Sequence, residues 1–223
     1  MSSTDFVETS DAKATRGLYA AAVGLVVFLL MVKGLSRQSS EEEGFLWKAI
    51  AGYLACGLTI FAASYFVRVR LGFRTPSRRV AWASGIAIGI ACVWVAGRFV
   101  WKHPLHTLAG LSAAEGHSIA YFYVCGLLLV PVVEEMLFRG LLWSAIGTRW
   151  PGRLGPISYA SLVTALLFGF LHWPGLYGQA TSGGWVIVAS ATAGGLVFGY
   201  LRDRLGVLWT GLAVHVIGNG AGF

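Results

Sequence analysis

The sequence predicts an all-α protein, a bundle of about seven transmembrane helices with a polar cavity between the fourth, fifth and last of them. Three observations predict this architecture. First, 56% of the 223 residues are hydrophobic and 12% are charged, whereas about a quarter of the residues of a soluble protein are charged. Second, several segments approach the ~20 apolar residues that cross a hydrocarbon core. Third, acidic and basic side chains lie inside some of these segments, where such residues are functional by default.

Apolar segments divide the chain. The seven predicted spans cover residues 17–35, 45–67, 80–101, 118–147, 156–173, 184–200 and 205–221. Residues 1–16 are polar and mixed in charge, so we predict a disordered N-terminal tail. The spans leave no room for a separate soluble domain. We therefore expect one membrane domain, made of N-terminal helices over 17–117 and a core over 118–221.

Basic residues in short loops explain the formal net charge of +7. The loop between the second and third spans is rich in arginine, which predicts that it is cytoplasmic. Alternation of the spans puts two further pairs of arginines on the same side. These residues are Arg68, Arg70, Arg74, Arg78, Arg79, Arg149, Arg153, Arg202 and Arg204. We therefore expect an integral protein of the bacterial inner (cell) membrane and no binding of nucleic acid.

Glycines four residues apart allow neighbouring membrane helices to approach closely. Two such pairs occur, Gly85 with Gly89 and Gly195 with Gly199. We assign them a packing role. The three cysteines lie in three different spans, without the spacing of a disulfide framework or a metal site. We expect them to be buried thiols.

The fourth span carries two adjacent glutamates, Glu134 and Glu135, and then Arg139. On a helix Glu135 and Arg139 lie one turn apart and differ by about 40° in direction. Glutamate before the cation is also the favourable order, so we expect a buried ion pair. Glu134 points about 100° away from Glu135 and needs a partner from another helix. Because an acidic residue near the bilayer centre costs roughly 3 kcal/mol, we expect Glu134 to be functional.

Two other spans supply polar partners. His172 lies one turn beyond Phe168 at the end of the fifth span, and His215 and Asn219 lie four residues apart in the last span. Each feature alone is compatible with a packing role, and His215 with Asn219 with interhelical hydrogen bonds. Together, on three separate helices, they are hard to explain by packing.

A carboxylate, two imidazoles and a carboxamide suit the activation of water. We expect Glu134 to be a general base assisted by His172, and His215 and Asn219 to donate hydrogen bonds to a developing oxyanion. The sequence has no His-Glu-x-x-His motif, whose spacing is typical of zinc proteases. We expect no cofactor. The alternative is a zinc ion held by Glu134, His172 and His215, which are all potential ligands.

The motifs Glu134-Glu135-x-x-x-Arg139, Phe168-x-x-x-His172 and His215-x-x-x-Asn219 resemble, in order, those of the CAAX-protease and bacteriocin-processing family, also called CPBP or Abi. Residues 200–214, YLRDRLGVLWTGLAV, resemble it as well. The resemblance covers about residues 118–220.

This resemblance implies a glutamate-type (formerly metallo-) intramembrane endopeptidase acting on a membrane-associated peptide or protein. The family's eukaryotic members, the CAAX prenyl endopeptidases, remove three residues after a prenylated cysteine. The catalytic residues would be Glu134, His172, His215 and Asn219. The supporting residues would be Glu135, Arg139 and Phe168.

Two other classes of protein compete with a protease. A non-catalytic bacteriocin-immunity or membrane-scaffold protein of the same family has no need of the full polar set. A proton-coupled transporter uses intramembrane Glu and His as relays. Against a transporter, the sequence has no repeat that relates two halves and has a single polar cluster.

Overall fold

A computed structural model describes residues 10–36, 44–66, 71–73, 77–78, 122–177 and 183–221 of the chain. The predicted third span, 80–101, lies outside these residues, as does the pair Gly85 and Gly89. Each of the other six predicted spans contains a helix.

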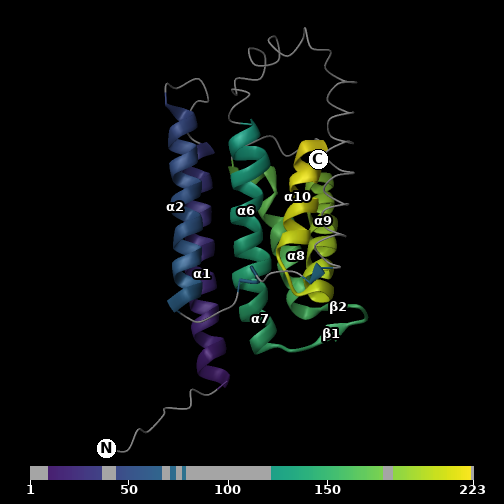
Figure 1. Ribbon diagram of the computed structural model, residues 1–223. Coiled ribbons are helices and arrows are strands. Elements are labelled where there is room, and N and C mark those ends of the chain that lie inside the picture. The colour runs from purple at the N-terminus through teal and green to yellow at the C-terminus, as the bar shows by residue number, and fades with distance from the viewer. Residues whose placement is uncertain are drawn as a thin grey trace, which may run out of the picture.

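The helices run up and down a bundle (Figure 1). The separate helices are α1 (Ser10–Ser36), α2 (Phe45–Phe66), α8 (Tyr159–Leu171), α9 (Gly184–Leu205) and α10 (Trp209–Ala221). Another long helix is an unbroken succession of η2 (Phe122–Leu129), α6 (Val130–Glu135), η3 (Met136–Leu142) and α7 (Trp143–Arg149). The strands β1 (Arg153–Leu154) and β2 (Ile157–Ser158) pair antiparallel after it, and the 3-10 helix η4 (Pro174–Tyr177) follows α8.

Three helical segments are long and apolar enough to cross a membrane by length and composition: Ala12–Leu35, Phe45–Phe66 and Gly184–Leu205. In contrast, α8 and α10 have 13 residues each, fewer than the ~20 that a span requires. Strand β2, the second strand of the hairpin, occupies the start of the predicted fifth span, 156–173. Gly206, with φ of 69°, caps α9 in the left-handed conformation, so α10 begins only at Trp209. The described residues therefore do not confirm seven spans.

α1 begins at Ser10, inside the segment that composition predicts to be a disordered tail. That prediction is wrong for residues 10–16. Ala14 is buried at 2% exposure, and α1 packs against α7. A tertiary contact thus orders residues whose polarity alone predicts disorder.

π-helical segments flank the two glutamates, since η2 precedes α6 and η3 follows it. Such segments are rare and are frequent at functional sites. Each of them has a backbone carbonyl that accepts a hydrogen bond from a distant side chain. Asn219 Nδ2 donates to Gly126 O at 3.0 Å, and Arg202 Nε donates to Arg139 O at 3.1 Å.

Small residues bring α8 and α9 together. A Cβ added at Gly199 would lie 2.7 Å from Ser161 Cβ, and one at Gly195 would lie 3.0 Å from Ala165 Cα. The predicted close approach is therefore confirmed for this pair of glycines.

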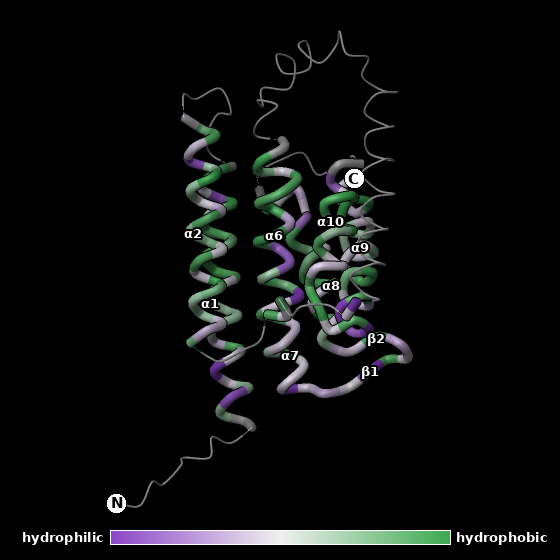
Figure 2. The backbone as a smooth tube through the Cα atoms, in the orientation of Figure 1, coloured by the Kyte–Doolittle hydropathy of each residue, from purple (hydrophilic) through white to green (hydrophobic). Residues whose placement is uncertain are grey.

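Large apolar side chains are exposed on the outer faces of α1, α2 and α9, as at Leu30, Leu58 and Val186. This is the pattern of helices that face lipid. Figure 2 shows the same helices as mostly hydrophobic, with hydrophilic residues on α6 and at the end of the bundle that carries β1 and β2.

Candidate active site

The ion pair predicted on the fourth span is present. Arg139 Nη1 lies 3.1 Å from Glu135 Oε1, and both side chains are fully buried. The guanidinium carbon also lies 4.5 Å from the centroid of the Phe168 ring and 5.0 Å from that of Phe198. Aromatic faces attract a cation at such distances. With the Phe138 ring at 5.7 Å, one carboxylate and three rings thus surround the arginine in the interior of the bundle.

His215 on α10 lies between the two glutamates. Its Nδ1 is 3.1 Å from Glu135 Oε1, and its Nε2 is 3.4 Å from Glu134 Oε2. The partner that Glu134 requires from another helix is therefore His215. The ring of His215 thus bridges the two carboxylates.

A glycine permits this approach of α10. Gly211, one turn before His215, is buried, and a Cβ there would lie 3.1 Å from Glu135 Oε2. On the other side, the His215 ring stacks on the Phe198 ring with centroids 4.9 Å apart. The imidazole is thus held by an aromatic face as well as by its two nitrogens.

His172 follows directly after the last residue of α8, and a hydrogen bond to the backbone orients its ring. The ring Nδ1 lies 2.8 Å from the carbonyl oxygen of Phe168. Because a carbonyl only accepts hydrogen bonds, Nδ1 carries the proton, and Nε2 of the neutral ring is left as an acceptor. The Phe168 ring contacts both histidines, with its centroid 4.5 Å from that of His172 and 5.6 Å from that of His215.

Asn219 contacts a different part of the long helix. Its Nδ2 donates to Gly126 O on η2, eight residues before Glu134. Both ring nitrogens of His215 are directed at carboxylates. These contacts do not favour an oxyanion site made by His215 and Asn219, which stays a prediction.

A cavity of about 280 Å³ lies beside the cluster, and Glu134 and His172 line it. Most of its other walls are apolar or aromatic, and they come from α1, α2, η3, α8, η4 and α9. No described residue of α10 lines this cavity, so the prediction of a cavity between the fourth, fifth and last helices is not confirmed for the last helix. α10 contacts the glutamates through His215 without reaching this space.

The sequence did not predict that residues of the N-terminal helices α1 and α2 line this cavity. They are Phe28 and Val32 from α1 and Tyr53 from α2. Phe28 and Val32 are ordinary apolar residues of a membrane span, and no spacing distinguishes them. Tyr53 offered a weak signal, a phenol within an apolar segment.

Within the part of the chain that the structure describes, no three His, Cys, Asp or Glu side chains are arranged to hold a metal ion. The zinc alternative requires Glu134, His172 and His215 to converge within about 2.1 Å of one point. The Phe168 ring packs against both imidazoles, and this packing does not favour such convergence.

The described part of the chain is thus a helical membrane bundle with a buried polar cluster beside an apolar cavity. Residues 116–221 match the family model of Rce1-like type II CAAX prenyl endopeptidases. The match covers 106 of the 223 residues and confirms the resemblance to CAAX proteases seen in the motifs. Neither a curated protein nor a solved structure matches the chain.

The matched range contains every candidate residue of the site, whereas α1 and α2 lie outside it. The matched family consists of membrane proteases, and three helices are apolar enough to cross a bilayer. These two findings indicate an integral membrane protein of the hydrolase class.

Proposed function

We propose that the protein is an intramembrane endopeptidase that hydrolyses a peptide bond with a water molecule activated by Glu134. The observation that carries this proposal is the shared cavity. Glu134 and His172 reach it from different helices, and its other walls are mostly apolar. A concave apolar site with a few convergent polar groups is the usual form of a binding or active site.

The reaction requires one proton to move twice. Glu134 takes a proton from water, and the oxygen of that water forms a bond to the carbonyl carbon of the substrate. The carbon–nitrogen bond then breaks, and Glu134 returns the proton to the departing amine. His172 Nε2, left as an acceptor by the Nδ1 contact with Phe168 O, accepts a hydrogen bond from the same water and orients it.

The remaining polar residues support Glu134. His215 holds it from α10, Glu135 holds His215, and Arg139 pairs with Glu135. We keep Asn219 as an oxyanion donor. One of its two amide hydrogens serves Gly126 O, and the other remains for a substrate oxygen.

The family match supports a CAAX-type substrate, a membrane-bound peptide cleaved near a lipidated cysteine. The apolar cavity walls suit the apolar residues of such a peptide. A bacteriocin-immunity or scaffold protein is less well supported, because such a protein does not need a carboxylate and an imidazole on the same cavity.

We expect catalysis without a metal. A strong chelator then leaves the cleavage rate of the purified protein unchanged, and metal analysis finds well below one zinc per chain. Stoichiometric zinc, with activity lost on its removal and regained on its return, would overturn this expectation and leave the protease proposal standing.

The decisive test compares two adjacent glutamates in proteoliposomes. The probes are an internally quenched farnesylated CAAX peptide and its unprenylated counterpart, with products identified by mass spectrometry. Glu134→Gln keeps size and hydrogen bonding but cannot accept a proton, so we expect turnover to fall at least ~10²-fold with unchanged folding.

Glu135→Gln is the matched control, because the same chemical change one residue later removes the partner of Arg139. We expect it to unfold more easily. A Glu134→Gln protein that folds normally and cleaves at the wild-type rate would exclude Glu134 as the base. Wild-type protein that cleaves no membrane-bound peptide would favour the scaffold alternative.

A further inference from the structure

The apolar cavity beside Glu134 is lined partly by helices that the family match does not include. Phe28 and Val32 lie one turn apart on α1, and Tyr53 lies on α2. Both helices lie outside the matched residues, whereas Glu134 and His172, on which the proposed reaction depends, lie within them. One cavity therefore joins the proposed catalytic residues to a wall made by another part of the chain.

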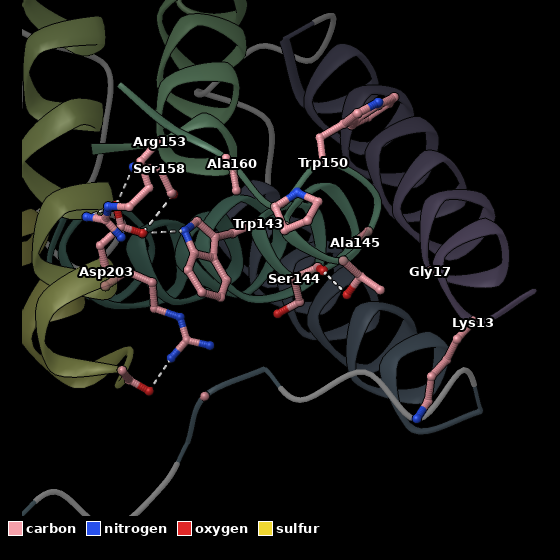
Figure 3. A pocket seen from close by; sticks show the side chains of 17 residues that line it. Lys13, Gly17, Trp143, Ser144, Ala145, Trp150, Arg153, Ser158, Ala160 and Asp203 are labelled. Atoms are coloured by element: carbon pink, nitrogen blue, oxygen red, sulfur yellow. Dashed lines mark hydrogen bonds and ion pairs between the residues drawn. The ribbon is translucent and has the colours of Figure 1, made fainter. Parts of the chain in front are cut away.

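The larger cavity of the bundle does not offer this combination. It has a volume of about 850 Å³ and lies at the end that carries the β1–β2 hairpin (Figure 3). The buried carboxylate on its wall, that of Asp203, already accepts hydrogen bonds from Ser158 Oγ at 2.8 Å and Trp143 Nε1 at 3.1 Å. None of the described residues that line it is a histidine or a glutamate. The smaller cavity is thus the one in which a wall and the proposed catalytic residues share the same space.

Glycines bring both N-terminal helices close to the long helix. On α1, Gly24 lies one turn before the first cavity residue, and a Cβ there would lie 3.2 Å from Leu137 Cδ1. On α2, Gly57 lies one turn after Tyr53, and a Cβ there would lie 3.5 Å from Val133 Cγ2, in the residue before the proposed base. These close approaches fix how far the side chains of α1 and α2 reach into the cavity.

Phe28 is connected to the site by a series of ring contacts. Its ring meets that of Phe138 edge to face, with centroids 6.4 Å apart, and the Phe138 ring meets that of Phe168 at 5.1 Å. The Phe168 ring in turn contacts His172. The guanidinium of Arg139 lies over both Phe138 and Phe168, so a change at either ring disturbs the buried ion pair. Within the described residues no such contact involves Phe28, whose size can therefore change without removing a partner of that pair.

The volume of the smaller cavity limits what it can hold. About 280 Å³ lies just below the ~300–1,000 Å³ of pockets that enclose a drug-sized ligand. Ile187, on the wall that α9 contributes, is 46% exposed, so the wall reaches the surface of the bundle and the rest of a substrate can lie outside. Because the proposed reaction places the scissile carbonyl beside Glu134, the side chain next to that carbonyl is the group that fills the remaining space.

We propose that Phe28 and Val32 determine which substrate residue is accepted beside the scissile bond, because they set the size of this cavity. Both side chains are apolar, so binding gains from the burial of an apolar substrate side chain, and a side chain that is too large overlaps with the Phe28 ring. This inference rests on the proposed function, since it concerns the bond that the enzyme cleaves. It adds that α1, a helix outside the family match, selects the substrate.

The test measures kcat/KM in proteoliposomes for internally quenched, membrane-bound peptides. Two series of peptides vary one residue, either before or after the scissile bond, between alanine, leucine and tryptophan. One methylene more or fewer in an apolar pocket changes selection by roughly 10-fold or more. We therefore expect Phe28→Ala, which removes a ring, to raise kcat/KM for tryptophan relative to leucine at least ~10-fold in one series. Val32→Phe fills the cavity, and we expect it to lower kcat/KM for leucine relative to alanine by about the same factor.

The matched control is Phe45→Ala, because Phe45 is similarly buried on α2 and is not among the described residues that line the cavity. We expect it to keep the wild-type ratios. Unchanged ratios in the Phe28 and Val32 variants, or an equal shift in the control, would overturn this inference while the proposed function stands. If Phe28→Ala does not fold, Val32→Phe decides the question alone. Wild-type protein that cleaves no peptide would instead overturn the proposed function, and this inference with it.

Discussion

Two buried arginines hold different parts of the bundle in different ways. Arg202, 5% exposed, has backbone carbonyls as hydrogen-bond partners at Arg139 O and Gly206 O. Arg139, 0% exposed, meets one carboxylate and aromatic rings, and its Nε and Nη2 have no hydrogen-bond partner among the described residues. Native proteins rarely leave buried donors unsatisfied. The comparison separates an arginine that is hydrogen-bonded to the backbone from one that is held by a carboxylate and aromatic rings.

Arg202 and Asn219 nevertheless make the same kind of contact with the long helix. Arg202 Nε serves a carbonyl in η3, and Asn219 Nδ2 serves a carbonyl in η2. Each π-helical segment of the long helix is thus stabilised by a side chain from a later helix. The glutamates lie in the α-helical turns between these two supported segments.

The largest expected effect in stability is on the Glu135–Arg139 pair. Glu135→Gln or Arg139→Gln leaves one buried charge without its partner, which typically costs about 3–5 kcal/mol. Unfolding in detergent measures this loss. The charge-swapped double variant, Glu135→Arg with Arg139→Glu, should recover part of it. Two single variants as stable as wild type would contradict the buried ion pair.

Arg202→Gln is the companion experiment for the arginine that is hydrogen-bonded to the backbone. Its loss removes the hydrogen bonds to the buried carbonyl of Arg139 and to the carbonyl of Gly206, at about 1 kcal/mol each. We therefore expect a smaller loss than at Arg139. A cost equal to that of Arg139→Gln would break the distinction between the two arginines.

The variant Asn219→Ala tests whether Asn219 acts in catalysis or only supports a backbone carbonyl. As an oxyanion donor it should contribute roughly 10²–10³ in turnover, and we expect a loss of that size at nearly unchanged substrate affinity. The measurement is kcat and KM on the cleaved peptide. Normal turnover with reduced stability would show that Asn219, like Arg202, only supports a backbone carbonyl.

The smallest expected effect is on the contact of α9 with α8 and Arg139. A Cβ at Gly195 would lie 3.0 Å from both Arg139 Nη2 and Ala165 Cα. Gly195→Ala should cost about 1–2 kcal/mol, in the lower part of the range for overpacking. Gly194→Ala is the matched control, because its Cβ would meet only the Phe198 ring, at 3.7 Å. Equal melting temperatures for the two variants would contradict the tight packing around Arg139.

Local patterns in the sequence determined where the described helices lie and how one pair of charges meets. Runs of about 20 apolar residues predict α1, α2 and α9, because a helix satisfies all backbone hydrogen bonds of such a segment within the bilayer. The spacing of Glu135 and Arg139 predicts their contact, since residues four apart are neighbours on a helix. The ordered motifs are specific enough to predict the family of residues 116–221.

Only the tertiary structure decided which helix faces which. The bond of His215 to Glu135 joins residues 80 positions apart, and the walls at Phe28 and Tyr53 come from helices outside the family match. Periodicity gives the direction of a side chain on its own helix. It does not give the rotation and depth of the neighbouring helix, which depend on small residues such as Gly195 and Gly211 and on close packing. For that reason His215 was predicted as a residue of the site, but its position between the two glutamates was not.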